Sequence, residues 1–210
     1  MTDATAGAPF APIAAPADSL PATLPMVLEQ LWQRIAAALD GRWPPWALPQ
    51  LATLGPQGPS SRVVALRSVD AAARRFVFHT DARSDKVRDL RSDPRASVTF
   101  WDPADAIEAR FAGTASVHVG DDIALAAWRQ VSPLRRVASA IAAPPATPLG
   151  APQRFDAIAS TPDDADAIGH FAVVRVCAVA LDWLWLGPRD MRRALFRWDD
   201  VGATATWVVP

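Results

Sequence analysis

Residues 51–70 read LATLGPQGPSSRVVALRSVD, residues 76–90 read FVFHTDARSDKVRDL, and residues 93–101 read DPRASVTFW. These three segments decide the fold. The glycines and prolines at 55–59 predict a turn between two extended runs. A β-hairpin is predicted next, because apolar strands at 60–69 and 76–80 are separated by a break at 70–74.

A short amphipathic helix is predicted after the second of these strands. Val87 and Leu90 are three positions apart among polar residues, which places them on one helical face, and Ser84 is a suitable N-cap. The first turn of a helix offers unpaired backbone N–H groups and the positive end of the dipole, which favour an anion. Arg83 and Lys86 lie at this helix start, where a cation costs roughly a few tenths of a kcal/mol unless an anion binds.

The basic and hydroxyl side chains of this region therefore indicate a phosphate-binding site. They are Arg62, Arg67, Thr80, Arg83, Ser84 and Lys86. An alternative is that the two cations at the helix start are solvated surface charges paired with Asp81 and Asp85, since such pairs are common and contribute little.

With these residues the chain resembles the pyridoxamine 5'-phosphate oxidase-like FMN-binding split barrels, in their short, less-characterised branch. Six matches occur in the family's order and cover most of the chain. They are RVVALR (62–67) for R-x-V-x-L-[KR], FHTD (78–81) for F-Y-T-[ND], RSDK (83–86) for [RG]-S-x-K, DPRASVTF (93–100) for the strand after N-P-R, RFAGTA (110–115) for R-[IF]-x-G-x-[AV], and LWLG (184–187) with RRALF (192–196) for the closing strands. The resemblance implies a mainly β fold with flanking helices (α+β), an antiparallel split β-barrel of the FMN-binding type.

The resemblance also implies FMN as the cofactor. Arg62 and Lys86 would hold its phosphate, with hydroxyl hydrogen bonds from Thr80 and Ser84. Arg67 would lie near the flavin ring, where a guanidinium stabilises the negative charge of the reduced state. The full set of implied cofactor contacts is Arg62, Val63, Val64, Arg67, His79, Thr80, Arg83, Ser84, Lys86, Glu108, Trp185 and Arg193.

The chain departs from the family pattern at two of these positions. Glu108 stands where the family usually has Gln, and a carboxylate beside an electron-rich flavin would oppose reduction. His79 stands where Tyr is common. It would donate to a phosphate or stack, or else be a partly buried strand histidine with one ordinary hydrogen bond.

Arg62 and Arg67 pose a geometric difficulty, because both fall in the predicted strand at 60–69. Side chains alternate along a strand, so residues five apart face opposite sides. A bulge within the strand would resolve this, as would a ligand lying across the strand's edge between two subunits. The resemblance implies the second arrangement, a homodimer with FMN at its interface.

Composition fits one ordinary globular domain with a tail. The chain has 210 residues, 50% hydrophobic and 20% charged, and a net charge of -1, which gives no bulk attraction for nucleic acid or anionic membranes. Cys177 lies in an apolar run and reads as a small buried hydrophobe. A single cysteine permits no intrachain disulfide, so a reducing cytoplasm is expected.

The predicted organisation is an Ala/Pro-rich disordered tail at 1–25 and a single domain at 26–210. The tail lacks the features of a secretory signal, and no apolar run approaches the roughly twenty residues that span a bilayer. Further helices are expected at 28–39, from 121 and at 133–141, with final strands near 170–186, 192–199 and 204–209.

Other site classes find little support in the sequence. The three histidines show no metal-ligand spacing with the single cysteine, so no metal site is predicted. Neither a nucleophile elbow nor a Walker or dinucleotide-binding loop is present. The tryptophans are expected to pack in the core or an interface, except Trp185, which would pack by the flavin.

The first functional hypothesis is an FMN-dependent oxidoreductase acting on a small molecule, with no catalytic residue assigned. The cluster that binds substrate phosphate in true pyridoxamine 5'-phosphate oxidases is incomplete here. Arg189 is its remaining anion-binding candidate, and Met191 replaces a histidine. The alternatives are a genuine pyridoxamine 5'-phosphate oxidase, a flavin-binding module or carrier without catalysis, and a β-barrel adapter that has lost the cofactor.

Overall fold

The computed structural model describes residues 21–41, 44–152, 164–188 and 190–210. Its elements in chain order are α1 (Leu24–Leu39), α2 (Pro44–Ala47), β1 (Gln50–Gly55), β2 (Gly58–Val63), β3 (Leu66–Asp70), β4 (Arg75–Asp81), α3 (Asp85–Ser92), β5 (Arg95–Asp102), β6 (Ile107–His118), α4 (Asp122–Gln130), α5 (Pro133–Ala140), α6 (Asp164–Gly169), β7 (Phe171–Leu186), β8 (Met191–Asp199) and β9 (Gly202–Val208).

The described strands form one nine-stranded sheet in which all pairs are antiparallel. The order is β2-β1-β5-β6-β7-β4-β3, and β8 pairs with both β7 and β9. The prediction of a mainly antiparallel β fold with flanking helices is therefore confirmed. The hairpin turn at 55–59 and the helix after β4 are found where the glycines, prolines and apolar spacing indicated.

The core lies on one face of the strands because side chains alternate along them. Phe76 and Phe78 of β4 are fully buried, and Phe76 packs against Phe111 of β6 with ring centroids 4.8 Å apart. Helix α1 covers this core with an apolar stripe that includes Leu31 and Ile35. The alternate residues of β4, among them His79, therefore face away from the core.

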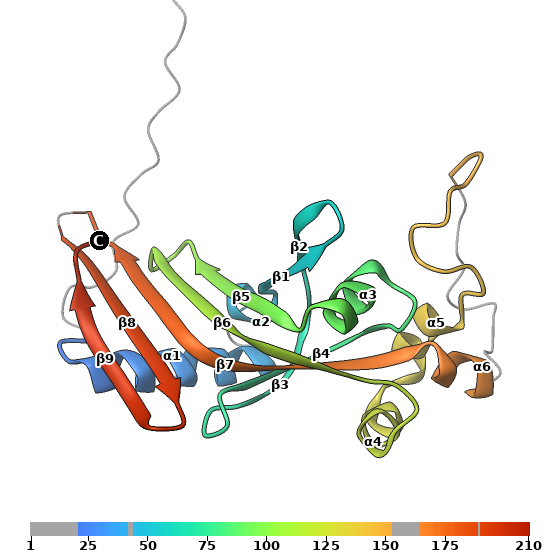
Figure 1. The fold of residues 1–210 in the computed structure, drawn as a ribbon, viewed down its shortest axis with the longest axis horizontal. Coiled ribbons are helices and arrows are strands. Elements are labelled where there is room, and N and C mark those ends of the chain that lie inside the picture. Colours follow the sequence, from blue (N-terminus) through green and yellow to red (C-terminus); the bar gives the residue numbers. More distant parts are fainter. Residues whose placement is uncertain (1–20, 42–43, 153–163, 189) are drawn as a thin grey trace, which may run out of the picture.

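Strands β6 and β7 run side by side along most of the molecule (Figure 1). The chain leaves the sheet after His118 and returns at Phe171, and His118 is paired with Val173. The helices α4, α5 and α6 of this insert lie at one end of β7, and the β8–β9 hairpin lies at the other (Figure 1). A second apolar cluster, which includes Trp128 and Phe171, packs the insert onto the sheet.

Two local expectations need correction, and one helix, α2, was not predicted. The predicted strand at 60–69 is two strands, because β2 pairs with β1 whereas β3 pairs with β4. Helix α1 begins at Leu24, inside the segment assigned to the tail, where the Thr23 hydroxyl accepts a hydrogen bond from the Met26 backbone N–H; residues 1–20 lie outside the described part.

The prediction of a buried cysteine is wrong. Cys177 is exposed, because Val176 and Ala178 are the neighbours that face the core and alternation turns the cysteine outward. No helix among the described residues combines the length and the apolar character needed to cross a bilayer.

Candidate functional site

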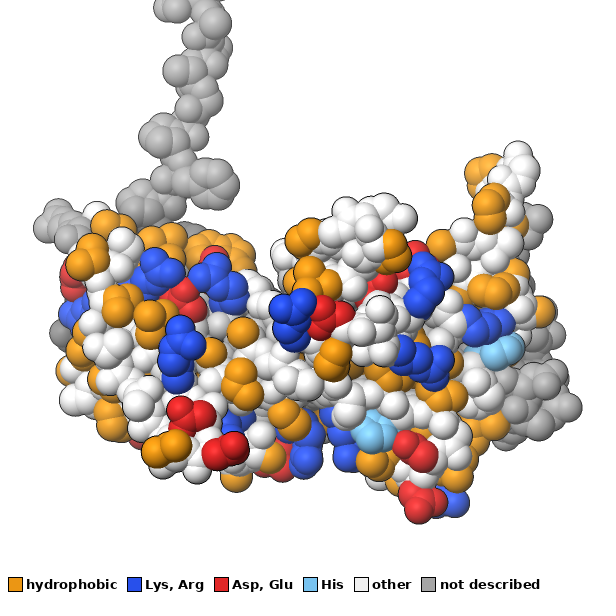
Figure 2. Space-filling model, viewed as in Figure 1, with side chains coloured by type: hydrophobic (Ala, Val, Ile, Leu, Met, Phe, Trp, Pro, Cys, Tyr) orange, Lys and Arg blue, Asp and Glu red, His pale blue; other side chains and the backbone are white. Residues whose placement is uncertain are grey.

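Basic side chains gather around α3 and also over the β7–β8 end of the sheet (Figure 2). Around α3, the Lys86 Nζ donates a hydrogen bond to the Thr80 Oγ1 at 3.1 Å, and the hydroxyl oxygens of Thr80 and Ser84 are 3.5 Å apart. The pKa of Lys86 is lowered first by burial and then by the nearby charge of Arg62. The structure thus brings together the four residues expected at the phosphate. We call Arg62, Thr80, Ser84 and Lys86 the phosphate cluster.

Arg62 reaches the phosphate cluster from β2 and is held by buried polar groups. Its Nη1 donates to the Leu51 carbonyl at 3.1 Å and to the Thr53 hydroxyl at 2.8 Å. Thr53 in turn donates to the buried Asp89 at 2.8 Å. Burial lowers the pKa of Arg62, and the Asp89 carboxylate, 3.9 Å away, offsets this effect only in part. The guanidinium is therefore well oriented but incompletely neutralised.

Ser84 occupies the N-cap position of α3, as predicted, but its side chain does not cap the helix. The hydroxyl donates instead to the Asp81 carbonyl at 2.7 Å. The hydroxyl's one proton is thus committed, and its oxygen keeps only acceptor capacity toward the phosphate cluster. The first-turn N–H groups of α3 receive nothing from this side chain.

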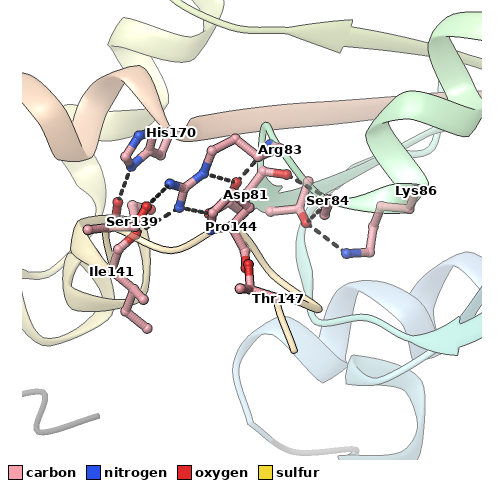
Figure 3. Close-up of polar contacts among 11 residues, drawn as sticks. Asp81, Arg83, Ser84, Lys86, Ser139, Ile141, Pro144, Thr147 and His170 are labelled. Carbon is pink, nitrogen blue, oxygen red and sulfur yellow. Dashed lines mark hydrogen bonds and ion pairs between the residues drawn. The ribbon is translucent and has the colours of Figure 1, made fainter. Parts of the chain in front are cut away.

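Arg83 is not brought to the phosphate cluster. Its Nη2 contacts an Asp81 carboxylate oxygen at 2.7 Å, and its two Nη atoms donate to the carbonyls of Ile141 and Ala142 at 2.8 Å each. Figure 3 shows the Arg83 guanidinium pointing away from Lys86 and toward the end of α5. Of the two cations at the helix start, Arg83 is thus the one that pairs with an acidic side chain, Asp81. Its bonds to the two carbonyls also connect the loop after β4 to the end of α5.

A cavity of about 640 Å³ lies next to the phosphate cluster, between α4, α5 and the face of β3, β4 and β7 that is turned away from the core. Thr80 lines the cavity and is also a member of the phosphate cluster, so the cavity adjoins the cluster. Its size falls within the range of small-molecule sites. Arg67, His79, Arg135, Phe171 and Arg175 are among its lining residues.

His79 faces this cavity with its ring edge against Phe171, the centroids being 4.9 Å apart. Burial, followed by the charges of Arg67 and Arg135, lowers the pKa of His79 to about 4. The imidazole is therefore neutral at pH 7. The described residues supply no hydrogen-bond partner for His79, so the ordinary hydrogen bond of the second alternative is not found. A contact of this ring with a phosphate or a flavin stays a prediction.

The structure resolves the difficulty over Arg62 and Arg67, because the two residues lie on different strands. Arg67 follows the break between β2 and β3 and lines the cavity. Its Nε is buried with no hydrogen-bond partner among the described residues. Of the two valines between them in the motif, Val63 is 61% exposed and Val64 packs partly against the core.

Three expected contacts lie at the other end of the sheet. Glu108 and Arg193 flank Leu184 in the strand register, nine residues along β7 from Arg175 of the cavity, or roughly 30 Å at about 3.3 Å per residue. Trp185 is buried in the core. Within one chain these side chains do not meet the phosphate cluster, and Arg189 lies outside the described residues.

Sequence reasoning missed two cavity residues, Arg135 and Arg175. A signal for Arg175 existed, since it is the one charge within the apolar run 171–179, and a charge in a half-buried strand needs a polar environment. Arg135 carries no comparable signal. Only the packing of α5 over the sheet brings it into the cavity.

The sheet order defines an antiparallel split barrel, and basic side chains cluster beside its strand β4. The sequence profile described as Pyridoxamine 5'-phosphate oxidase matches residues 48–166, more than half of the chain. The chain therefore belongs to the pyridoxamine 5'-phosphate oxidase family.

Curated relatives match over shorter stretches. The chain is 39% identical over 75 residues to a pyridoxine/pyridoxamine 5'-phosphate oxidase of Thermosynechococcus vestitus, covering 35% of each chain. It is 42% identical over 65 residues to one of Paraburkholderia xenovorans, covering 30% of each. The matched part thus spans about a third of the length of these relatives.

Solved structures agree on the fold. A pyridoxamine 5'-phosphate oxidase-related, FMN binding protein from Nostoc punctiforme has a TM-score of 0.70 at 22% identity, covering 91% of this chain and all of that one. PhzG from Burkholderia lata, solved with tetrahydrophenazine-1-carboxylic acid, has a TM-score of 0.66 at 21% identity, covering 94% and 98% of the two chains. The split-barrel prediction is therefore confirmed.

Proposed function

We propose that this protein is an FMN-dependent oxidoreductase acting on a small molecule. The observation that carries the proposal is the phosphate cluster, in which Arg62 and Lys86 converge with the hydroxyls of Thr80 and Ser84. Two partly buried cations with lowered pKa values disfavour each other until an anion joins them. The phosphate of FMN supplies that anion, and charge-assisted hydrogen bonds are the strong ones.

The residues present fit the rest of the cofactor as well. Arg67 stands at the cavity wall with an unpartnered Nε, a donor suited to the carbonyl edge of a flavin ring. FMN, when bound, supplies hydride transfer at its central ring. The chain's own part is to anchor the phosphate, to place positive charge beside the ring and to shape the cavity in which a substrate lies.

We further propose a homodimer with FMN at the subunit interface. Glu108 and Arg193 lie roughly 30 Å from the cavity along β7. Their partly exposed side chains would approach the cofactor only if a second copy of the chain presented that end of its sheet. A cytoplasmic location belongs to the same proposal, since the exposed Cys177 is an unpaired thiol.

The test begins with the visible spectrum of the purified protein. We expect a yellow protein with one FMN per subunit that bleaches on anaerobic addition of NADH, NADPH or a reducing substrate. A colourless protein that ignores added FMN would overturn the proposal. Turnover of pyridoxine 5'-phosphate would assign it to the genuine oxidases instead.

A flavin-binding carrier is the second candidate, and Glu108 favours it. This carboxylate replaces the family's usual glutamine and would oppose reduction of a nearby flavin. Glu108 does lie beside Arg110, at 3.6 Å, which partly balances its charge. A yellow protein that stays oxidised with every donor would favour the carrier, and restoration of bleaching by Glu108→Gln would identify the residue responsible.

A further inference from the structure

Ser116, His118 and Asp121 form a chain of hydrogen bonds at the end of β6. The Ser116 Oγ lies 2.9 Å from the His118 Nε2, and the His118 Nδ1 lies 2.8 Å from an Asp121 carboxylate oxygen. Because an ionised carboxylate only accepts hydrogen bonds, the Nδ1 carries the proton and donates to Asp121. In the neutral ring the Nε2 is then the acceptor, and the Ser116 hydroxyl donates to it.

The local structure explains why these three side chains meet. Ser116 and His118 are two positions apart in a strand, so alternation places them on the same face. Asp121 is the N-cap of α4, where one carboxylate oxygen accepts from the Ala124 N–H at 2.9 Å and the other is left for the imidazole. The hydrogen bond from Ala124, more than the one from His118, lowers the pKa of Asp121, so the carboxylate is ionised at neutral pH.

The same order of groups activates the serine of many hydrolases. The imidazole accepts the hydroxyl proton, while the carboxylate fixes the tautomer of the ring and stabilises its charged form. Such triads recur on unrelated folds and are recognised by geometry, so the lack of a nucleophile elbow in this sequence does not exclude one. Ser116 is exposed, and a substrate in solution therefore reaches its hydroxyl.

Arg175 lies beside the serine. The two residues are paired across β6 and β7, and paired residues share a face of the sheet with Cβ atoms about 4.5–5.5 Å apart. The Nε of Arg175 is buried and has no hydrogen-bond partner among the described residues. A guanidinium in this position is suited to donate to the oxygen of a carbonyl group held at the Ser116 Oγ, which stabilises the negative charge that develops there.

We propose that Ser116, His118 and Asp121 form a second reactive site, at which the protein hydrolyses small carboxylic esters. The inference goes beyond the proposed function and needs no flavin. The Ser116 Oγ attacks the ester carbonyl while its proton passes to the His118 Nε2. When the ester C–O bond breaks, His118 returns the proton to the leaving oxygen, and water then cleaves the acyl-serine by the same steps to release the acid.

The exposure of Ser116 also indicates the class of ester. A serine that stands on the surface of a strand makes few contacts with an acyl chain, so little binding energy is available from a long one. We therefore expect esters with a short acyl group and a good leaving group, such as the acetyl esters of phenols.

The direct test is chemical labelling of the purified protein with diisopropyl fluorophosphate. This reagent loses fluoride as the serine oxygen bonds to phosphorus, and mass spectrometry of peptides locates the adduct. We expect Ser116 to be labelled faster than Ser61, an exposed serine of β2 whose hydroxyl donates to the Gln50 side chain at 3.4 Å instead of to an imidazole. Labelling of Ser116 no faster than of Ser61 would overturn the proposal.

Hydrolysis of p-nitrophenyl acetate provides the second measurement. After subtraction of the uncatalysed rate, Ser116→Ala and His118→Gln should each be slower than wild type by roughly a hundredfold, within the range of general-base catalysis. Ser61→Ala is the matched control and should match wild type. A free imidazole also attacks this ester, so activity that survives Ser116→Ala but not His118→Gln would mean that the histidine reacts alone and that the proposal fails.

Asp121→Asn tests the positioning role of the carboxylate. The amide keeps an oxygen for the Ala124 N–H, so α4 remains capped, but the ring of His118 loses its charged partner. Labelling and ester hydrolysis should both slow, and the downfield Nδ1 proton signal of His118 should disappear from the NMR spectrum. Labelling at the wild-type rate would remove Asp121 from the site and overturn the triad.

Discussion

The two ends of β7 use the same residue type in opposite ways. At the β8 end, Arg193 donates to Asp182 at 2.9 and 2.7 Å, and Arg110 contacts the same carboxylate. At the insert end, the cavity arginines find no carboxylate among the described residues. The first end is internally balanced, whereas the second carries guanidiniums that the described residues leave unpaired.

The difference shows that the fold decides whether an arginine is paired, because the fold determines which acidic side chains lie within reach of it. All of these arginines lie in β-strands or on a helix beside the sheet, and nothing in their local sequence separates them. The strand register separates them. Asp182 of β7 is paired with Arg110 of β6 and contacts Arg193 of β8. Arg175 of β7 is paired with Val77 of β4 and Ser116 of β6, neither of which is acidic. Strand pairing thus neutralises one end and leaves the other open.

The largest expected effect concerns the phosphate cluster. Arg62→Ala or Lys86→Ala should weaken FMN binding by about 1.5–3 kcal/mol, because each removes a hydrogen bond to a charged group. Fluorescence titration with FMN measures the change. Riboflavin, which lacks the phosphate, should bind both variants as it binds wild type, and retention of wild-type FMN affinity in both would refute the assignment.

The pH dependence of stability sharpens the comparison at the cavity. The folded protein lowers the pKa of His79 from 6.5 to about 4, so the unfolded chain binds the proton first. Stability contributed by the neutral ring is therefore lost as the pH falls from about 6.5 to about 4, by about 1–2 kcal/mol after discounting for solvent screening.

Urea unfolding between pH 7 and pH 4 checks this loss, with His79→Gln as the comparison protein. The variant should lose less stability than wild type over this range. The imidazole proton signal of His79 provides a second measurement. Titration near 6.5 in the ligand-free protein would mean that the cavity cations are already neutralised.

Asp182→Asn breaks the balanced end. The hydrogen bonds from Arg193, and then those from Arg110, hold the pKa of Asp182 below its usual range against the opposing effect of burial. The carboxylate therefore stabilises the fold at neutral pH, and this contribution is lost as the pH falls below about 4. We expect the variant to be about 1 kcal/mol less stable at pH 7 in urea unfolding. Unchanged stability would mean that the carboxylate contributes nothing to this end of the sheet.

The smallest effect is expected at the surface of α3. Arg88 pairs with Asp85 at 2.7 Å, and both side chains are mostly exposed. Arg88→Ala should change stability by less than about 0.5 kcal/mol in urea unfolding and should leave FMN binding as in wild type. A large loss of FMN affinity here would mean that charge anywhere on α3 attracts the cofactor, which would weaken the case for a specific cluster.

Local patterns predicted most of the fold. The glycine and proline turn at 55–59, the apolar strand at 76–80 and the helix at 28–39 each correspond to an observed element. The break between β2 and β3 was missed because an apolar run carries no mark of a change in strand partner. Cys177 was misplaced for a related reason, since both faces of that run are apolar in sequence.

The site was predictable only where its residues are close in sequence. Thr80, Ser84 and Lys86 lie within seven positions and indeed meet at the start of α3. Arg83, in their midst, is drawn away by carbonyls 58 and 59 positions further along the chain. The cavity arginines come from three distant segments, so their convergence follows from tertiary packing alone.

The way the α4–α6 insert joins the sheet has a consequence for the evolution of this fold. The chain departs after His118 and rejoins at Phe171, where β6 and β7 are already paired. A different excursion of similar span would leave the strand ladder and the phosphate cluster intact while replacing the wall that carries Arg135. Under the proposed function, the cofactor would be held by residues of the sheet and α3, while the insert could vary independently in sequence.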